Sequence, residues 1–246
     1  MVLKQIDINA DLGEGTGNDE AVMPFISSCS IACGGHFGNK TTMLSTIELA
    51  KEHSVKVGAH PSYPDADNFG RKILSLPKSE LKESILGQLV DFYRACEVGE
   101  VLVHHIKLHG ALYNYAAINA PTADAVLEAI MDSGERPKLY VPYDSILAKK
   151  AENRLPLVYE AFIDRRYNED LTLLTRSDSA AVIKSSEEAW NQLLTLFYKK
   201  EVQTVQGNKQ TINASTFCIH GDNRNCIEIL QYIRDRMKAH SLSLLK

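Results

Sequence analysis

The sequence predicts an α/β fold, a closed seven-stranded βα barrel of the TIM-like kind, formed by one domain that spans residues 1–246. Short β-branched or alternating runs recur along the chain, and each is followed by a turn and an amphipathic helical stretch. Seven such runs fit the 246 residues, a length that is ordinary for one α/β barrel. No internal repeat, low-complexity tract or Pro/Gly-rich linker marks a domain boundary.

The strand candidates are runs of β-branched or alternating apolar residues bounded by turn residues. They are Gln5–Asp11, Cys29–Cys33, Val55–His60, Val101–Lys107, Lys138–Pro142, Val158–Phe162 and Thr216–His220. The helix candidates, with apolar residues three and four positions apart, are Thr41–His53, Glu80–Cys96, Ala123–Met131, Ser145–Asn153, Glu187–Lys199 and Asn225–His240. Ser79, just past Pro77, is expected to cap the second of these helices. Glu201–Ala214 interrupts the alternation, and its Gly207-Asn208 pair predicts a small inserted hairpin near 201–214, before the last strand.

Polar residues occupy one face of several strand candidates, since side chains alternate between the two faces of a strand. This face carries Asp7, Asn9 and Asp11 on the first run, Lys56, Gly58 and His60 on the third, His105, Lys107 and His109 on the fourth, Glu160, Phe162 and Asp164 on the sixth, and Cys218, His220 and Asp222 on the last. The opposite face is mainly apolar, as expected for strands that are covered by helices. Because a barrel builds its active site from several strand ends at the C-terminal mouth, these residues predict one shared pocket there.

Composition and charge exclude several classes of protein. A net charge of −4 with no basic run gives little attraction to nucleic acid or to an anionic membrane. No stretch approaches the roughly 18 apolar residues of a membrane-spanning helix, and the first residues, MVLKQIDINA, do not resemble a signal peptide. The odd number of cysteines, five, predicts no disulfide framework. We therefore expect a cytoplasmic protein whose partner is a small molecule or another protein.

Two glycine-rich turns lack the spacing of nucleotide-binding loops. Asp11–Gly17 misses the G-x-G-x-x-G pattern by one residue, and in Gly34–Thr41 the residue Asn39 separates the glycine from the lysine. The glycines of the first turn are expected to let the backbone bend tightly around Asp11 and Glu14. The second turn can still bind an anion through backbone N–H groups at a helix N-terminus.

Four histidines, His36, His60, His109 and His220, fall at the ends of strand candidates. Neutral imidazoles beside a carboxylate are a common divalent-metal site, so a divalent metal stays open as a cofactor. Hydrogen-bonded packing explains any one of these histidines as well. No H-x-H on the first strand and no H-E-x-x-H identifies a particular metal.

Charged residues near two strand ends are candidates for binding an anionic substrate. Lys107 and His109 lie two residues apart, hence on one face, and could polarise a carbonyl group or hold a carboxylate. The alternative is a structural ion pair of Lys107 with Asp11 or Asp164. Arg165 is a candidate bidentate partner for a carboxylate or phosphate.

An ordered set of short motifs resembles the LamB/YcsF family. The motifs are Asn9-Ala10-Asp11-Leu12-Gly13-Glu14, Ile31-Ala32-Cys33-Gly34 with His36, Gly58-Ala59-His60-Pro61, Phe69-Gly70-Arg71, Lys107 with His109-Gly110-Ala111-Leu112-Tyr113-Asn114, Phe162 with Asp164-Arg165 and Tyr167, and Cys218 with His220-Gly221-Asp222. The resemblance runs from residue 7 to about residue 236. It implies a barrel akin to the glycoside hydrolase/deacetylase superfamily. It also implies a hydrolase, an ATP-dependent 5-oxoprolinase that opens the lactam 5-oxo-L-proline to L-glutamate together with partner subunits B and C.

The resemblance and the strand-end pattern together give a list of expected site residues. The expected catalytic residues are Asp11, Glu14, Lys107, His109, Asp164 and Asp222, and the expected substrate-binding residues are Asn9, His36, His60, Arg71, Arg165 and His220. In this hypothesis Arg71, Lys107 or Arg165 holds the substrate carboxylate or a phosphate, and Asp11, Glu14 or Asp164 acts as general base. The histidines shape the pocket or transfer protons. The alternatives are a standalone metal-dependent amide or deacetylase-type hydrolase and a non-catalytic lactam-binding subunit.

The sequence departs from the family pattern at several positions, among them Gly35, Phe37, Lys72 and Leu108. The departure at Asn39, where the family has Asp, is expected to matter most. If that carboxylate is a base or a ligand, its loss would weaken the activity or change the substrate.

Overall fold

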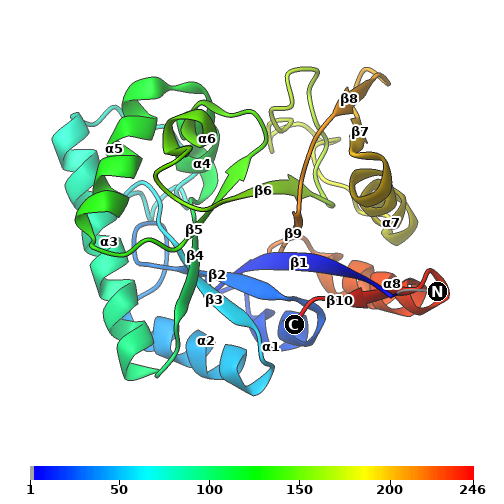
Figure 1. Ribbon diagram of the computed structural model, residues 1–246, viewed down its shortest axis with the longest axis horizontal. Helices are drawn as coiled ribbons and strands as arrows, with labels where there is room; N and C mark the ends of the chain where they lie inside the picture. The colour runs from blue at the N-terminus through cyan, green and yellow to red at the C-terminus, as the bar shows by residue number, and fades with distance from the viewer. Residues whose placement is uncertain (1–2) are drawn as a thin grey trace.

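The strands of the computed structural model, which describes residues 3–246, close into a parallel barrel (Figure 1). Its strands are β1 (Lys4–Leu12), β2 (Ser28–Ala32), β3 (Lys56–His60), β4 (Val103–Lys107), β5 (Lys138–Pro142), β6 (Leu157–Phe162) and β9 (Thr216–His220). Each strand pairs in parallel with the next in this order, and β9 pairs with both β6 and β1, which closes the ring. The predicted seven-stranded βα barrel is confirmed, and each strand candidate is a strand whose ends shift by at most two residues. Residues 1 and 2 of the predicted domain lie outside the described residues.

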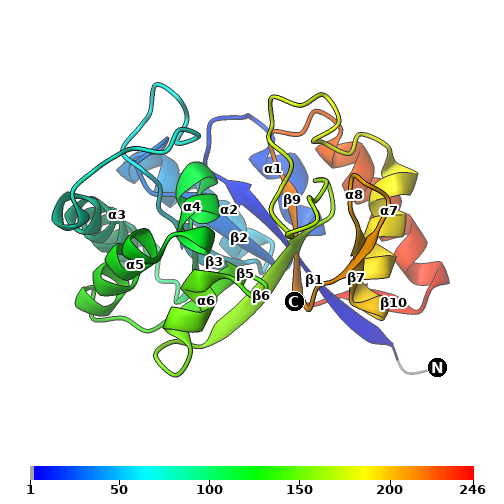
Figure 2. The ribbon, with the colours of Figure 1, turned by 90° about the horizontal axis from the view of Figure 1, so that it is seen from above.

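Helices fill the connections between strands and surround the barrel, with α3 to α6 on one side and α7 and α8 on the other (Figure 2). Their bounds are α1 (Asp19–Val22), α2 (Lys40–Glu52), α3 (Lys78–Val98), α4 (Gly110–Ile118), α5 (Ala120–Asp132), α6 (Ile146–Ala151), α7 (Ser186–Leu194) and α8 (Cys226–Ala239). A 3₁₀ turn, Met23–Phe25, follows α1, and a π-helical turn, Thr195–Lys199, extends α7. Every helix candidate corresponds to a helix. The expectation for Ser79 was wrong, because α3 already begins at Lys78 and Ser79 lies in its first turn.

Smaller strands lie outside the barrel. β7 (Glu201–Gln203) and β8 (Lys209–Thr211) pair antiparallel, which confirms the predicted hairpin. Gly207 in its turn has φ +91°, a conformation that glycine adopts without strain. β10 (Leu242–Leu244), which the sequence did not predict, pairs with the first residues of β1. Among residues 3–246, no helix combines the length and the apolar character that crossing a membrane would require.

The alternation along the strands turns one face toward the helices and the other into the barrel. On β1, Ile6, Ile8 and Ala10 are buried in the apolar core, whereas Asn9 and Asp11 contact Lys107 of β4 across the barrel. Most barrels fill their interior with branched apolar side chains, so a polar interior of this kind needs partners for every buried charge. The five cysteines are buried and free, in agreement with the absence of a disulfide framework.

The layer beneath these charges is filled by aromatic rings. The His105 ring stacks on Tyr140 with centroids 4.0 Å apart, and its Nε2 lies 3.1 Å from the Ser30 hydroxyl. Gly58 on the neighbouring strand makes room for this ring, because a Cβ there would lie 2.4 Å from it. The charged groups are therefore supported from below and open only toward the C-terminal mouth of the barrel.

Candidate active site at the barrel mouth

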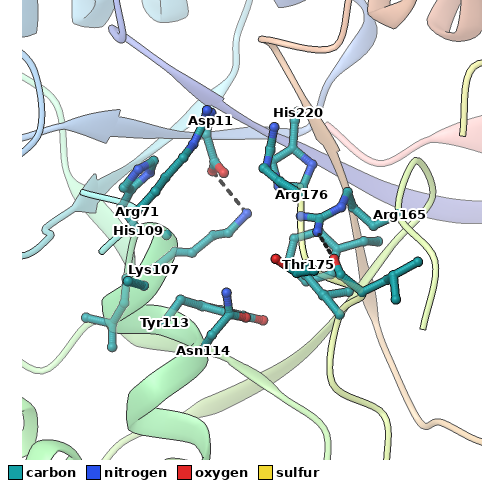
Figure 3. Close-up of a pocket in the computed structure, with 16 residues that line it drawn as sticks. Asp11, Arg71, Lys107, His109, Tyr113, Asn114, Arg165, Thr175, Arg176 and His220 are labelled. Carbon is teal, nitrogen blue, oxygen red and sulfur yellow. Dashed lines mark hydrogen bonds and ion pairs between the residues drawn. The ribbon is translucent and has the colours of Figure 1, made fainter. Parts of the chain in front are cut away.

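A buried ion-pair cluster surrounds Lys107 at the C-terminal end of the barrel, and Figure 3 shows its Asp11–Lys107 pair. The Lys107 ammonium group lies 3.0 Å from the Asp11 carboxylate and 2.8 Å from that of Glu160. It also donates to Asn9 Oδ1 at 3.2 Å and lies 3.0 Å from Cys218 Sγ. Burial lowers the pKa of Lys107, but the charge of Asp11 and the groups beside it raise the pKa by more, to well above its ordinary value. Lys107 is therefore a fixed cation at the floor of the site.

The two carboxylates beside Lys107 titrate differently. Burial raises the pKa of Asp11, yet the charges of His60 and Lys107 together bring it down to about 2. Burial raises the pKa of Glu160, and Lys107 offsets that rise only in part. Asp11 is thus the permanent anion of the cluster, and Glu160 is the member that takes up a proton more readily. Sequence reasoning did not name Glu160 as a site residue, although the alternation placed it on the inner face of its strand.

A second cluster lies beside the first and consists of one carboxylate and three imidazoles. Glu14 follows β1, His36 follows β2, His60 ends β3 and His109 follows β4. Glu14 Oε1 lies 2.9 Å from His36 Nε2, 3.1 Å from His109 Nδ1 and 3.7 Å from His60 Nε2. All four residues are at most 7% exposed. Parallel strands deliver them to one point because each strand ends at the same rim.

An Asp–His pair forms the opposite wall of the mouth. Asp164 Oδ1 accepts a hydrogen bond from His220 Nδ1 at 2.9 Å, and Asp164 Oδ2 accepts from the backbone N–H of His220 and from Asn223. Burial raises the pKa of Asp164, and the charge and hydrogen bonds of His220 lower it below the ordinary value. An ionised Asp164 holds Nδ1 of His220 in its protonated form, which leaves Nε2 free to accept a proton. Asp164 itself is fully buried and acts on the pocket through His220.

Arginines surround the outer mouth. Arg71 and Arg176 both form ion pairs with Asp222, the latter at 2.8 Å. Arg165 is buried below them and donates to the backbone carbonyls of Leu174 and Ala181, while burial and the charge of Arg176 lower its pKa to about 10. Two guanidinium groups thus share one carboxylate while a third lies beneath them, and the excess positive charge makes the mouth attract anions. Arg176 belongs to the long connection after β6, where no motif in the sequence marked it.

The pocket between these groups has a volume of about 190 Å³. At about 30 Å³ per molecule of liquid water, this is room for roughly six waters, or for one small metabolite. Of the residues expected from the sequence, Asp11, Arg71, Lys107, His109, Arg165 and His220 line it. The others support that lining: Asn9 contacts Lys107, Glu14, His36 and His60 contact one another and His109, Asp164 contacts His220, and Asp222 contacts Arg71.

Asn39 has a different place from the one expected. It is exposed and caps α2, where its side-chain oxygen accepts hydrogen bonds from the backbone N–H groups of Thr41 and Thr42. Asn and Asp cap helices about equally well. The departure from the family pattern therefore changes a helix cap.

Comparisons with known proteins point in one direction. The model of the LamB/YcsF family matches residues 6–246. The chain is 37% identical over 246 residues to the 5-oxoprolinase A subunit of Bacillus cereus (strain Q1), with 97% of both sequences covered. It is 39% identical over 237 residues to the protein of the same name from Bacillus cytotoxicus, with 93% of both covered.

Solved structures agree with these relatives. The lactam utilization protein from Thermus thermophilus superposes with a TM-score of 0.89 at 31% identity, with 98% of both chains covered. A mutant of a CE4 family pseudoenzyme with restored enzymatic activity gives a TM-score of 0.51 at 9% identity, covering 98% of this chain and 65% of the other. The second similarity concerns the fold alone.

Proposed function

This chain belongs to the LamB/YcsF family, and from that premise we propose that it is the A subunit of an ATP-dependent 5-oxoprolinase. The proposed reaction opens the lactam 5-oxo-L-proline to L-glutamate, with ATP hydrolysis, in a complex with subunits B and C. The observation that carries the proposal is the small pocket with a fixed cation at its floor and arginines at its mouth. We also propose that residues 1–246 act as one domain, because β1 and β9, from the two ends of the chain, close the barrel together.

The pocket suits the two polar ends of this substrate. A carboxylate is the preferred partner of guanidinium groups, and Arg71 and Arg176 present theirs at the mouth. The lactam carbonyl then points inward to Lys107, whose charge is in place before the substrate arrives. A preorganised cation of this kind stabilises the negative charge that develops on a carbonyl oxygen under attack.

Ring opening needs a base for the attacking water and a proton for the departing nitrogen. His220 lines the pocket with Nε2 unprotonated, and Asp164 stabilises the imidazolium ion that forms when it takes up a proton. The same imidazolium can then return the proton to the ring nitrogen. Asp11 keeps Lys107 in position, and Asp222 does so for the two arginines.

ATP enters this proposal as a co-substrate that activates the lactam. An amide is a poor electrophile, and transfer of the γ-phosphoryl group of ATP to its oxygen, with release of ADP, would open the carbonyl carbon to attack by water. Cleavage of the ring C–N bond then leaves γ-glutamyl phosphate, which a second water hydrolyses to glutamate and phosphate. Neither glycine-rich turn has nucleotide-binding spacing. We therefore place ATP with the partner subunits, facing the open mouth. A reaction that consumes ATP also agrees with the cytoplasmic location predicted from the sequence.

The test is release of glutamate from 5-oxoproline by this chain, by subunits B and C, and by all three together, with and without ATP. Product only from the complete, ATP-supplied mixture is the expected result. In that mixture, His220→Gln should lower kcat by about 100-fold or more, while the exposed His240→Gln should match the wild type. Ring opening by this chain alone without ATP would contradict the proposal and favour a standalone hydrolase. A fully active His220→Gln variant would remove His220 from the mechanism.

A further inference from the structure

The cluster of Glu14, His36, His60 and His109 has no assigned task in the proposed reaction, and its protons are unusual. His60 Nδ1 lies 2.8 Å from the backbone carbonyl oxygen of Lys107, and His109 Nε2 lies 2.9 Å from that of Phe69. A carbonyl oxygen only accepts hydrogen bonds, so each of these two nitrogens carries the hydrogen. The opposite nitrogens, His60 Nε2 and His109 Nδ1, then carry free lone pairs in the neutral rings.

These two lone pairs point at each other and at negative charge. His60 Nε2 and His109 Nδ1 are 3.0 Å apart. Glu14 Oε1 lies 3.1 Å from the second and 3.7 Å from the first, and Asp11 Oδ2 is 3.4 Å from His60 Nε2. With both rings neutral, electron-rich atoms therefore converge from three sides in a buried space. A cation at this point would satisfy all of them.

The spacing of the atoms fits a metal ion. The candidate ligand atoms of Glu14, His60 and His109 all lie within 4.8 Å of one another. A tetrahedral zinc ion with bonds of about 2.0–2.1 Å separates its ligand atoms by about 3.3–3.4 Å. The distances of 3.0, 3.1 and 3.7 Å among these three residues lie on both sides of that value.

The surroundings also have the form that metal-binding histidines need. Such a histidine normally donates its other N–H group to a carbonyl or carboxylate, which fixes the ring, and His60 and His109 both do so. Phe69, which supplies one of the carbonyls, has φ +54°, a left-handed conformation that is unfavourable for a residue with a side chain. Next to it Gly70 leaves room for the rings, because a Cβ there would lie 2.9 Å from both His109 and His36. Strained backbone held in place around a buried cluster is typical of functional sites.

We propose that Glu14, His60 and His109 bind one divalent transition-metal ion in the wall of the pocket, while His36, whose ring stacks in parallel on that of His109 at 3.6 Å, packs beside the site. Two imidazoles and one carboxylate favour Zn²⁺ and similar ions over Mg²⁺ or Ca²⁺, which prefer oxygen ligands. Three protein ligands leave the fourth position of a tetrahedral ion to water. The ion therefore fixes His109, which lines the pocket, and compensates the charge of Glu14. The inference does not depend on the identity of the lactam substrate.

The test uses the full chain alone, stripped of metal with a chelator and titrated with Co²⁺ and then with Zn²⁺. We expect one ion per chain, visible d–d absorption of Co²⁺ that Zn²⁺ displaces, and a rise in Tm with metal. Glu14→Gln and His60→Gln should weaken binding by about 100-fold or more, while His240→Gln, an exposed histidine far along the chain, should bind as the wild type does.

A second measurement uses only the wild-type protein, so its result does not depend on whether the variants fold. Zinc should shift the ¹⁵N resonances of His60 Nε2 and His109 Nδ1 and leave those of His240 unchanged. Absence of Co²⁺ absorption, or unchanged binding in both cluster variants, would overturn the site. A single proton shared by His60 and His109 with no metal-induced shift would also overturn it. The titration contains no lactam, ATP or partner protein, so its result is separate from the test of the proposed reaction.

Discussion

Replacing Lys107 by Met should destabilise the protein strongly, because it leaves the Asp11 carboxylate buried beside no lysine. Lys107 is 1% exposed and Asp11 is 6% exposed, so water cannot replace the lost partner. Removing one member of a buried ion pair typically costs about 3–5 kcal/mol. Glu160 can take up a proton and relieve its own charge, whereas Asp11, with a pKa lowered to about 2, loses the cation that helps to keep it ionised. For a chain of this size the loss corresponds to a fall in Tm of roughly 6–20 °C.

A double-mutant cycle tests whether the unpaired charge of Asp11 causes the loss of stability in Lys107→Met. Asp11→Asn added to Lys107→Met removes the stranded charge, so the double variant should be more stable than the sum of the two single losses predicts. A coupling free energy of about 2 kcal/mol or more is expected from urea unfolding at about pH 7, with Lys149→Met as the exposed-lysine control. A coupling free energy below about 0.5 kcal/mol would refute the reasoning, because the two residues would then contribute independently.

Other variants test the positioning of the site, its mouth and the helix cap. Asp164→Asn should lower kcat in the complete complex by about 100- to 10,000-fold, since His220 loses the carboxylate that fixes its proton, whereas an unchanged kcat would contradict this pairing. The same Asp164, whose pKa is lowered by folding, contributes stability above its unfolded pKa of about 3.9, which disappears as pH falls through the folded value. Urea unfolding should therefore show the wild type losing its advantage over Asp164→Asn progressively as the pH falls below about 5, and a constant difference would refute the shift. Arg176→Ala should raise KM for 5-oxoproline by about tenfold with a smaller change in kcat, and an unchanged KM would place the substrate carboxylate elsewhere. Asn39→Asp should alter activity less than about twofold and stability by less than about 0.5 kcal/mol, measured by glutamate release and Tm, because both residues cap α2.

The barrel could be predicted from the sequence because its strands alternate so regularly. On β1 and β4 every second residue is polar or charged in the half near the mouth, and this pattern places Asp11 and Lys107 on the inner face, where they form an ion pair. Helix α4 escaped prediction because its apolar residues are spread around the helix and only two residues, Leu108 and His109, separate it from β4. β10 escaped because three residues are too few for a periodic signal.

The site could be predicted where its residues lie on the strands or in the short motifs that follow them. Glu160 lies on the inner face of β6 and could have been predicted from the alternation, because a buried lysine on the inner face of another strand needs carboxylate partners. Arg176 belongs to a long loop whose path depends on packing, and no local pattern indicates that it reaches Asp222. The expected effect of Asn39 on activity was wrong for a related reason. The replacement of Asp by Asn is visible in the sequence as a lost charge, whereas only the hydrogen bonds of the side chain show that it caps a helix.

The barrel closes between strands from opposite ends of the chain, so the ring stays open until β9 has been synthesised. Asn9 of β1 donates to Thr216 of β9, a residue 207 positions later, at 2.8 Å. While a ribosome is still translating, β1 and β6 therefore present open edges that pair readily with other unfolded chains. A chain that stops before β9 has no closed ring and lacks His220, so the last barrel strand completes the fold and the pocket together.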